Sequence, residues 1–155
     1  MTTDPEAPMV RFSDVFAQLV RLEIELWNEL DDHLSTTAGL TLAQFQALAA
    51  IRGRGDAARV QDLSGDMSIT VGAASKVVDR LERDGLAVRS AHPFDRRSSL
   101  VGLTQRGAAA IATADQAAEE HLRTVLSPTL SEERVASLHS ELVALRADAR
   151  TQVTK

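Results

Sequence analysis

The hydrophobic pattern in the centre of this chain changes its period at Gly85. Before that glycine, apolar residues recur three and four positions apart, as on one face of an α-helix. From Leu86 the period is two, and residues 100–103, LVGL, supply a second short apolar run. The sequence therefore predicts a β-hairpin that directly follows a helix, with HPFDRRSS at its tip.

Two short helices are predicted before the hairpin. The first carries Val60, Leu63 and Met67 on one face, and Ser68-Ile69-Thr70 interrupts the pattern. The second runs from Val71 to Asp84, and its apolar positions are Ala74, Val77, Val78 and Leu81. Such a helix pair followed by a hairpin is the arrangement of a winged helix-turn-helix.

Longer helices are predicted on both sides of this centre. An apolar stripe follows 12–34, Gly39 is a plausible terminator, and Thr41 with Gln44 forms a capping-box pattern before a second helix. Thr104 and Ser131 are the predicted N-caps of two C-terminal helices. The fold class is therefore mainly α with a small β-hairpin wing.

The expected boundaries follow from these signals. We expect an N-terminal helix over 10–37, a winged helix-turn-helix domain over 41–104 and C-terminal helices over 105–150, with flexible termini at 1–9 and 151–155. The stripes on 12–34 and 135–149 exceed what the small central domain can cover. A homodimer that pairs these helices is the expected solution, with an intramolecular bundle as the alternative.

Charge is unevenly distributed along the chain, whose formal net charge is −5. Residues 70–107 hold seven basic and four acidic side chains, whereas residues 1–69 hold five and eleven. Lysine and arginine provide most of the affinity of proteins for nucleic acids. A short basic segment in an acidic chain is therefore typical of one surface that meets phosphate while the rest stays acidic.

Catalytic, cofactor and metal signals are weak. The sequence contains no Cys or Tyr and no HExxH, GxxxxGK[ST] or GxSxG motif, and its four histidines are scattered. We therefore predict that it is not an enzyme, holds no cofactor and has no metal site, although the run Glu119-Glu120-His121 could contribute to one across a dimer. The chain shows no signal peptide or membrane span, so a cytoplasmic protein without membrane partners is expected.

The segment VQDLSGDMSITVGAASKVVDRLERDGLAVRSAHPFDRRSSLVGLTQRG resembles the DNA-binding core of the MarR family of bacterial transcriptional regulators. Four landmarks occur in the family's order: a Leu-rich short helix, a recognition helix ending in DRLExxGL, a wing with DRR, and a closing LTxxG. The resemblance implies dimerisation helices on both sides and a homodimer on a palindromic double-stranded DNA operator. Repression is the family's commonest mode. One departure is His92, which stands where the family often has aspartate.

The residues expected to contact DNA fall on two elements. The outer face of the recognition helix is expected to meet the major groove and the backbone through Thr70, Gly72, Ala73, Ser75, Lys76 and Arg80. In the wing, Arg97 is the first choice for the minor groove, Arg96 for phosphate, and Asp95 for orienting one of the two. Which arginine enters the groove stays open at this point.

Many members of the family release DNA when a small, often aromatic and anionic molecule binds between the dimerisation helices and the winged domain. The resemblance places such an effector site at Arg11, Phe16, Val20, Phe45 and Leu48. Two other classes remain as alternatives. These are a winged-helix module that binds protein, and a helical ligand-binding domain that binds no DNA.

Overall fold

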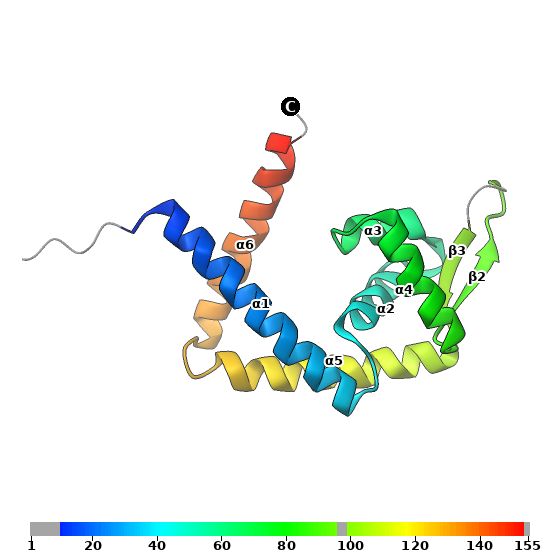
Figure 1. The fold of residues 1–155 in the computed structure, drawn as a ribbon, viewed down its shortest axis with the longest axis horizontal. Helices are drawn as coiled ribbons and strands as arrows, with labels where there is room; N and C mark the ends of the chain where they lie inside the picture. The colour runs from blue at the N-terminus through cyan, green and yellow to red at the C-terminus, as the bar shows by residue number, and fades with distance from the viewer. Residues whose placement is uncertain (1–9, 96–98, 154–155) are drawn as a thin grey trace, which may run out of the picture. The chain divides into compact units, whose positions relative to one another are not determined.

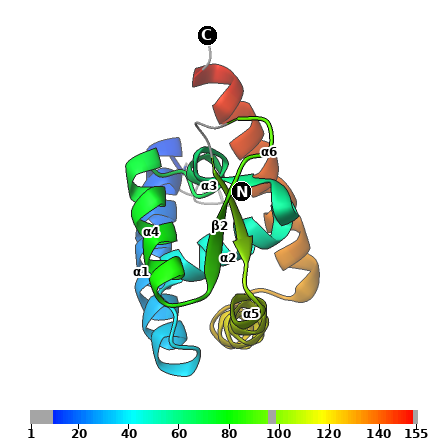
Figure 2. The same cartoon turned by 90° about the vertical axis from the view of Figure 1, so that its right-hand side faces the viewer.

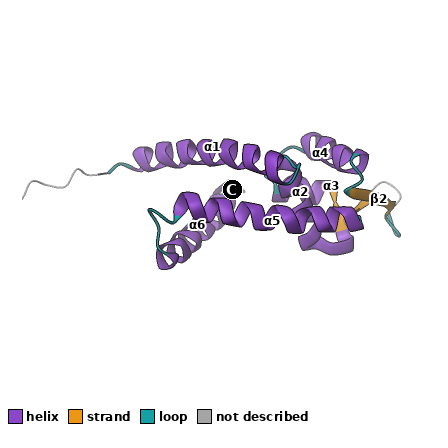
Figure 3. Cartoon of the chain, turned by 90° about the horizontal axis from the view of Figure 1, so that it is seen from below, coloured by secondary structure: helices purple, strands orange, loops and turns teal. Residues whose placement is uncertain are grey.

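The computed structural model describes residues 10–95 and 99–153 and divides into two compact units, Met1–Ala118 and Glu119–Lys155. The first unit holds the long helix α1 (Phe12–Thr37), α2 (Leu42–Arg54), α3 (Val60–Asp66), α4 (Val71–Arg83), strands β2 (Ala87–Ala91) and β3 (Ser99–Leu103), and the first part of α5 (Gln105–Leu126) (Figure 1). The second unit holds the end of α5 and α6 (Glu132–Val153). The mainly α fold with a hairpin wing is confirmed (Figure 3).

The wing contains one element that the sequence did not predict. A two-residue strand β1 (Ala58–Arg59) follows a single 3-10 turn, Gly55–Ala57, and pairs antiparallel with β3. The sheet therefore has three strands in the order β1-β3-β2. Two residues are too few to show a period of two, so hydrophobic alternation could not reveal this strand.

The helix boundaries follow the predicted local signals closely. The Thr41 hydroxyl accepts a hydrogen bond from the Gln44 N–H at 3.2 Å, and Gln44 Oε1 accepts one from the Thr41 N–H at 3.0 Å, which is the expected capping box. Gly39 and Gly85 end α1 and α4 with φ of 66° and 70°. Both values lie in the left-handed region that glycine adopts without steric cost.

The core of the first unit joins all of its long elements. Its largest fully buried side chains come from five helices and one strand: Leu34, Leu48, Ile51, Leu63, Val78, Leu81, Val101 and Ile111. The inner face of α4 follows the predicted spacing, because Ala74, Val77, Val78 and Leu81 are all buried. The opposite face of α4 is therefore free to meet a partner.

The terminal helices bury much less apolar surface. Only Leu30 and Leu34 of α1 are buried, and the residues of α6 from Glu132 to Ala149 are all exposed. Helix α6 continues to Val153, so residues 151–153 are helical rather than part of a flexible terminus as predicted. The sequence beyond Pro128 contains no glycine or proline to stop the helix.

Candidate DNA interface

The first turn of α4 presents polar and small residues to solvent. Thr70 caps this helix, because its hydroxyl accepts a hydrogen bond from the Ala73 N–H at 3.2 Å. Thr70, Gly72, Lys76 and Arg80 are exposed, whereas Ala73 and Ser75 are half-buried. A Cβ built on Gly72 would meet nothing within 4 Å, so the fold itself does not require glycine there.

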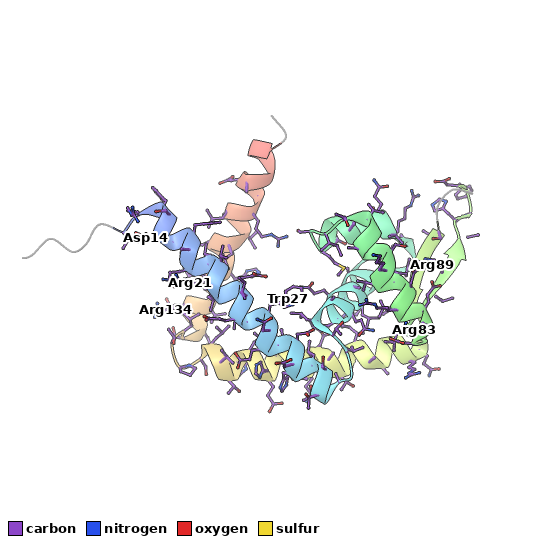
Figure 4. All side chains as sticks on the ribbon, in the orientation of Figure 1. Asp14, Arg21, Trp27, Arg83, Arg89 and Arg134 are labelled. Atoms are coloured by element: carbon purple, nitrogen blue, oxygen red, sulfur yellow. The ribbon has the colours of Figure 1, made fainter. Side chains whose placement is uncertain are left out.

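The hairpin runs back along α4, and a charged cluster fixes it there. Arg89, labelled in Figure 4, lies on β2. Its Nη2 lies 2.8 Å from Asp79 Oδ1, and its Nη1 pairs with Glu82. Its backbone N–H donates to Glu82 Oε1 at 2.9 Å. Sequence reasoning did not single out these three residues, although Asp79 and Glu82 belong to the DRLE landmark. These contacts attach the wing directly to the recognition helix.

The tip of the hairpin and the start of α4 lie toward the same end of the first unit (Figures 1 and 2). This arrangement follows from the chain path, since β2 starts where α4 ends and returns along it. Of the predicted wing residues, Asp95 is half-buried in the described part of the tip. Arg96 and Arg97 lie outside the described residues.

His92 contacts an arginine and the hairpin tip. Its Nε2 lies 2.7 Å from Arg59 Nη2 on β1, and its Nδ1 lies 3.2 Å from the backbone nitrogen of Phe94. A guanidinium is only a donor, so a bond to Arg59 requires Nε2 to accept. His92, which stands where the resemblance led us to expect aspartate, therefore contacts Arg59 through a ring nitrogen instead of a carboxylate.

The closing LTQRG segment attaches the base of the hairpin to α5. The Thr104 hydroxyl donates to the Gly85 carbonyl at 2.7 Å and accepts from the Gly107 N–H at 3.0 Å. The Thr104 N–H donates to the Leu86 carbonyl at 3.1 Å. A Cβ on Gly107 would stand 1.9 Å from that carbonyl oxygen, so this position requires glycine. The landmark therefore has a structural role.

The five residues expected to hold an effector do not form a single site in the described chain. Leu48 is fully buried in the core and Phe45 is half-buried on α2, whereas Phe16 and Val20 are exposed on the half of α1 that extends away from α2 (Figures 1 and 3). Arg11 pairs with Asp14 at 3.0 Å, and this hydrogen bonding holds the pKa of Asp14 below its ordinary value.

Two surface depressions on the first unit are lined by other residues. One, of about 290 Å³, lies along α1 and is bordered by Val10, Asp14, Val15, Gln18, Leu19 and Leu22. The other, of about 440 Å³, is bordered by Ala38, Gly39, Leu40, Arg83, Asp84, Leu86, Arg106 and Ala110.

Within the described residues, no group of three or more His, Cys, Asp or Glu is arranged to hold a metal ion. No described helix is long and apolar enough to span a membrane.

A helix pair whose second member has an exposed outer face, followed by a hairpin that pairs with a short strand from before the helices, defines a winged helix-turn-helix protein. The model of the MarR family matches residues 38–98. The multiple antibiotic resistance protein MarR of Escherichia coli K12 is 32% identical over 132 residues, which cover 81% of this chain and 91% of that protein. The chain belongs to the MarR family, whose members are transcriptional regulators.

Solved structures of relatives bound to DNA share the fold. A mutant MarR from Escherichia coli complexed with operator DNA is 28% identical, with a TM-score of 0.70, and covers 88% of this chain and 99% of that chain. Sco3205, a MarR family regulator from Streptomyces coelicolor in complex with DNA, is 22% identical, with a TM-score of 0.79 and coverage of 94% and 92%. The predicted family and its winged helix fold are thereby confirmed.

Proposed function

We propose that this regulator binds a palindromic operator in double-stranded DNA as a homodimer and acts as a repressor. The observation that carries the proposal is the shared orientation of the start of α4 and the hairpin tip (Figures 1 and 2). Both belong to the one segment with a basic excess in an acidic chain. One duplex can therefore meet both elements, the helix in its major groove and the wing in the adjacent minor groove.

The recognition helix contributes contacts of two kinds. Lys76 and Arg80 are exposed cations that reach guanine or phosphate, while the Thr70 and Ala73 methyl groups suit the thymine methyl. Ser75 can bond either base type, and Gly72 allows the backbone to approach closely. These assignments follow from side-chain chemistry and from the exposure of the outer face.

In the wing, Arg97 is the proposed minor-groove residue and Arg96 the proposed phosphate contact, with Asp95 orienting one of them. The narrow minor groove has a negative potential that attracts a guanidinium. Arg97→Ala is expected to reduce operator affinity at least tenfold, about 1.4 kcal/mol. Fluorescence anisotropy with labelled operator measures the effect, and an unchanged dissociation constant would remove this role from Arg97.

Exposed apolar residues on α1 and α6 support the homodimer. Phe12 and Phe16 are 96% and 68% exposed, and the α6 positions Val135, Leu138, Leu142 and Leu145 are also exposed. Apolar stripes of this length are normally covered by a partner, and symmetric pairing of identical chains is the commonest solution. Sedimentation at micromolar concentration should give twice the 16.7 kDa of one chain. A single species at the chain mass would refute the dimer.

Selection of bound sequences from random duplexes tests the proposed function directly. The expected product is a palindrome whose half-sites lie about one helical turn apart. A salt titration on the selected duplex should give a steep loss of affinity, since each phosphate contact releases counterions. A slope near zero would instead favour the protein-binding alternative. Retained small molecules without any DNA shift at low salt would favour the ligand-binding alternative.

Release of DNA by a small aromatic or anionic effector is a further part of the proposal, and it rests on the family resemblance. The described chain does not gather the five expected residues, so the proposal places their site in the assembled dimer. An effector can release DNA only if it binds the DNA-incompatible form more tightly. Sodium salicylate, a small aromatic anion, is a suitable first probe. An operator affinity that does not change in millimolar salicylate would argue against small aromatic anions as effectors.

A further inference from the structure

Phe94 stands almost fully in solvent at the tip of the hairpin. Its side chain is 94% exposed, whereas the other highly exposed phenylalanines, Phe12 and Phe16, belong to the apolar stripe of α1. Isolated apolar residues on a surface are common and need no explanation by themselves. Phe94 differs because the structure holds it in place at the tip of the wing.

The contacts that hold Phe94 come from His92. The two rings meet edge to face with centroids 6.4 Å apart at an interplanar angle of 70°. The Phe94 backbone nitrogen lies 3.2 Å from His92 Nδ1, and Arg59 on β1 lies 2.7 Å from the other ring nitrogen. The edge-to-face contact restricts the Phe94 ring, so the ring loses less conformational freedom on binding than an unsupported side chain.

The charge around Phe94 indicates what that partner is. The tip belongs to the segment 70–107, whose net charge is +3. The Arg89 cluster joins the hairpin that bears this tip to the recognition helix. Architectural proteins that bind the minor groove insert phenylalanine and other apolar side chains there beside cationic residues. Duplex DNA combines anionic phosphates with the apolar deoxyribose walls of its minor groove, and it fits this combination better than an acidic or apolar protein surface.

We propose that Phe94 is an apolar minor-groove contact of the wing, packing against deoxyribose and base edges beside the phosphate-binding residues. This inference rests on the proposed function, because it requires the wing to reach duplex DNA. In this role Phe94 adds affinity that does not depend on charge. Substitution of Phe94 should therefore change affinity in a different way from substitution of a cation.

The test compares Phe94→Ala, Phe94→Leu and the wild-type dimer on one duplex recovered by random-sequence selection, between 50 and 200 mM salt. Phe94→Ala is expected to weaken binding about tenfold at every salt concentration. A plot of log affinity against log salt concentration should therefore run parallel to that of the wild type, with the same slope. Phe94→Leu should recover most of the affinity. Val88→Ala is the matched control, because Val88 is an exposed apolar side chain of the same hairpin, on β2 and away from the tip, at 53% exposure.

A modified duplex places the contact in the minor groove. Replacing adenine by 2,6-diaminopurine in the flanks adds an amino group to the minor groove. This change should reduce the affinity of the wild type more than it reduces the affinity of the Phe94→Ala variant. Equal dissociation constants for Phe94→Ala and the wild type, a changed salt slope, or equal sensitivity of both proteins to the modified base would each overturn the proposal. A wild type that binds no duplex would refute the proposed function instead, so the two failures are distinguishable.

Discussion

Two glycines in this chain have opposite environments although both lie in helices. Gly107 in α5 has no room for a side chain, since its Cβ would stand 1.9 Å from the Leu86 carbonyl oxygen and 2.8 Å from the carbonyl carbon. Gly72 in α4 has open space around it. The sequence alone shows two glycines within helical patterns. It cannot distinguish a glycine that packing within the fold requires from one that close approach of DNA requires.

Gly107→Ala is expected to lower the free energy of unfolding by about 2 kcal/mol or more, because backbone atoms of the hairpin base must move to admit the methyl group. Urea denaturation followed by circular dichroism measures the change. Gly65→Ala is the matched control, since Gly65 lies in α3 with nothing within 4 Å of its Cβ. A Gly107 variant as stable as this control would contradict the explanation given for the LTxxG landmark.

Gly72→Ala should separate stability from DNA binding. Alanine has the higher helix propensity, so the free energy of unfolding is expected to rise by up to about 1 kcal/mol. Operator affinity should nevertheless fall several-fold, because the new methyl group keeps the start of α4 from the closest approach to the groove. Denaturation and anisotropy on the same preparation check both effects. Undiminished affinity would show that DNA does not approach the backbone at this residue.

At the scale of elements, the join between α4 and the wing determines the geometry of the DNA interface. Hydrophobic patterning predicted both elements: α4 from apolar residues three and four positions apart, which are buried, and the hairpin from two short apolar runs. It did not predict how they are joined, because the Arg89 cluster depends on side chains separated by up to ten positions. Strand β1 was missed for the related reason that its pairing with β3 is not local.

Arg89→Ala is expected to weaken operator binding about tenfold, about 1.4 kcal/mol. The substitution loosens the wing and leaves the carboxylates of Asp79 and Glu82 without their cation, on the helix that faces DNA. Adding Asp79→Asn and Glu82→Gln should recover part of the lost affinity, because it removes those unpaired charges. Anisotropy measurements on the three proteins test this. The absence of any recovery would mean that Arg89 acts by contacting DNA itself.

At the scale of the whole molecule, the exposed terminal helices are the main feature that a single chain leaves unexplained. The sequence predicted both helices, but in α1 only the last turns find a covering surface within the described chain, at Leu30 and Leu34. The expected effector site depended on helices approaching one another at long range. Local patterns do not specify that approach, so the site was the least predictable part of the molecule.

Leu142→Glu is expected to shift the protein from dimer to monomer and to abolish operator binding at nanomolar concentration, since a charge within an apolar stripe opposes association. Val143→Glu adds the same charge to the neighbouring position, which lies off the stripe of α6, and should stay dimeric. Sedimentation and anisotropy measure the two effects. A dimeric Leu142 variant with full affinity would exclude this stripe from the interface.

The contacts of His92 have a consequence for the wing as a whole. A neutral imidazole has one nitrogen that can accept a hydrogen bond, yet Arg59 and the Phe94 N–H each present a donor to this ring. The tautomer therefore selects between two attachments, one to the base strand and one to the tip. The base and the tip of the wing thus share a single lone pair.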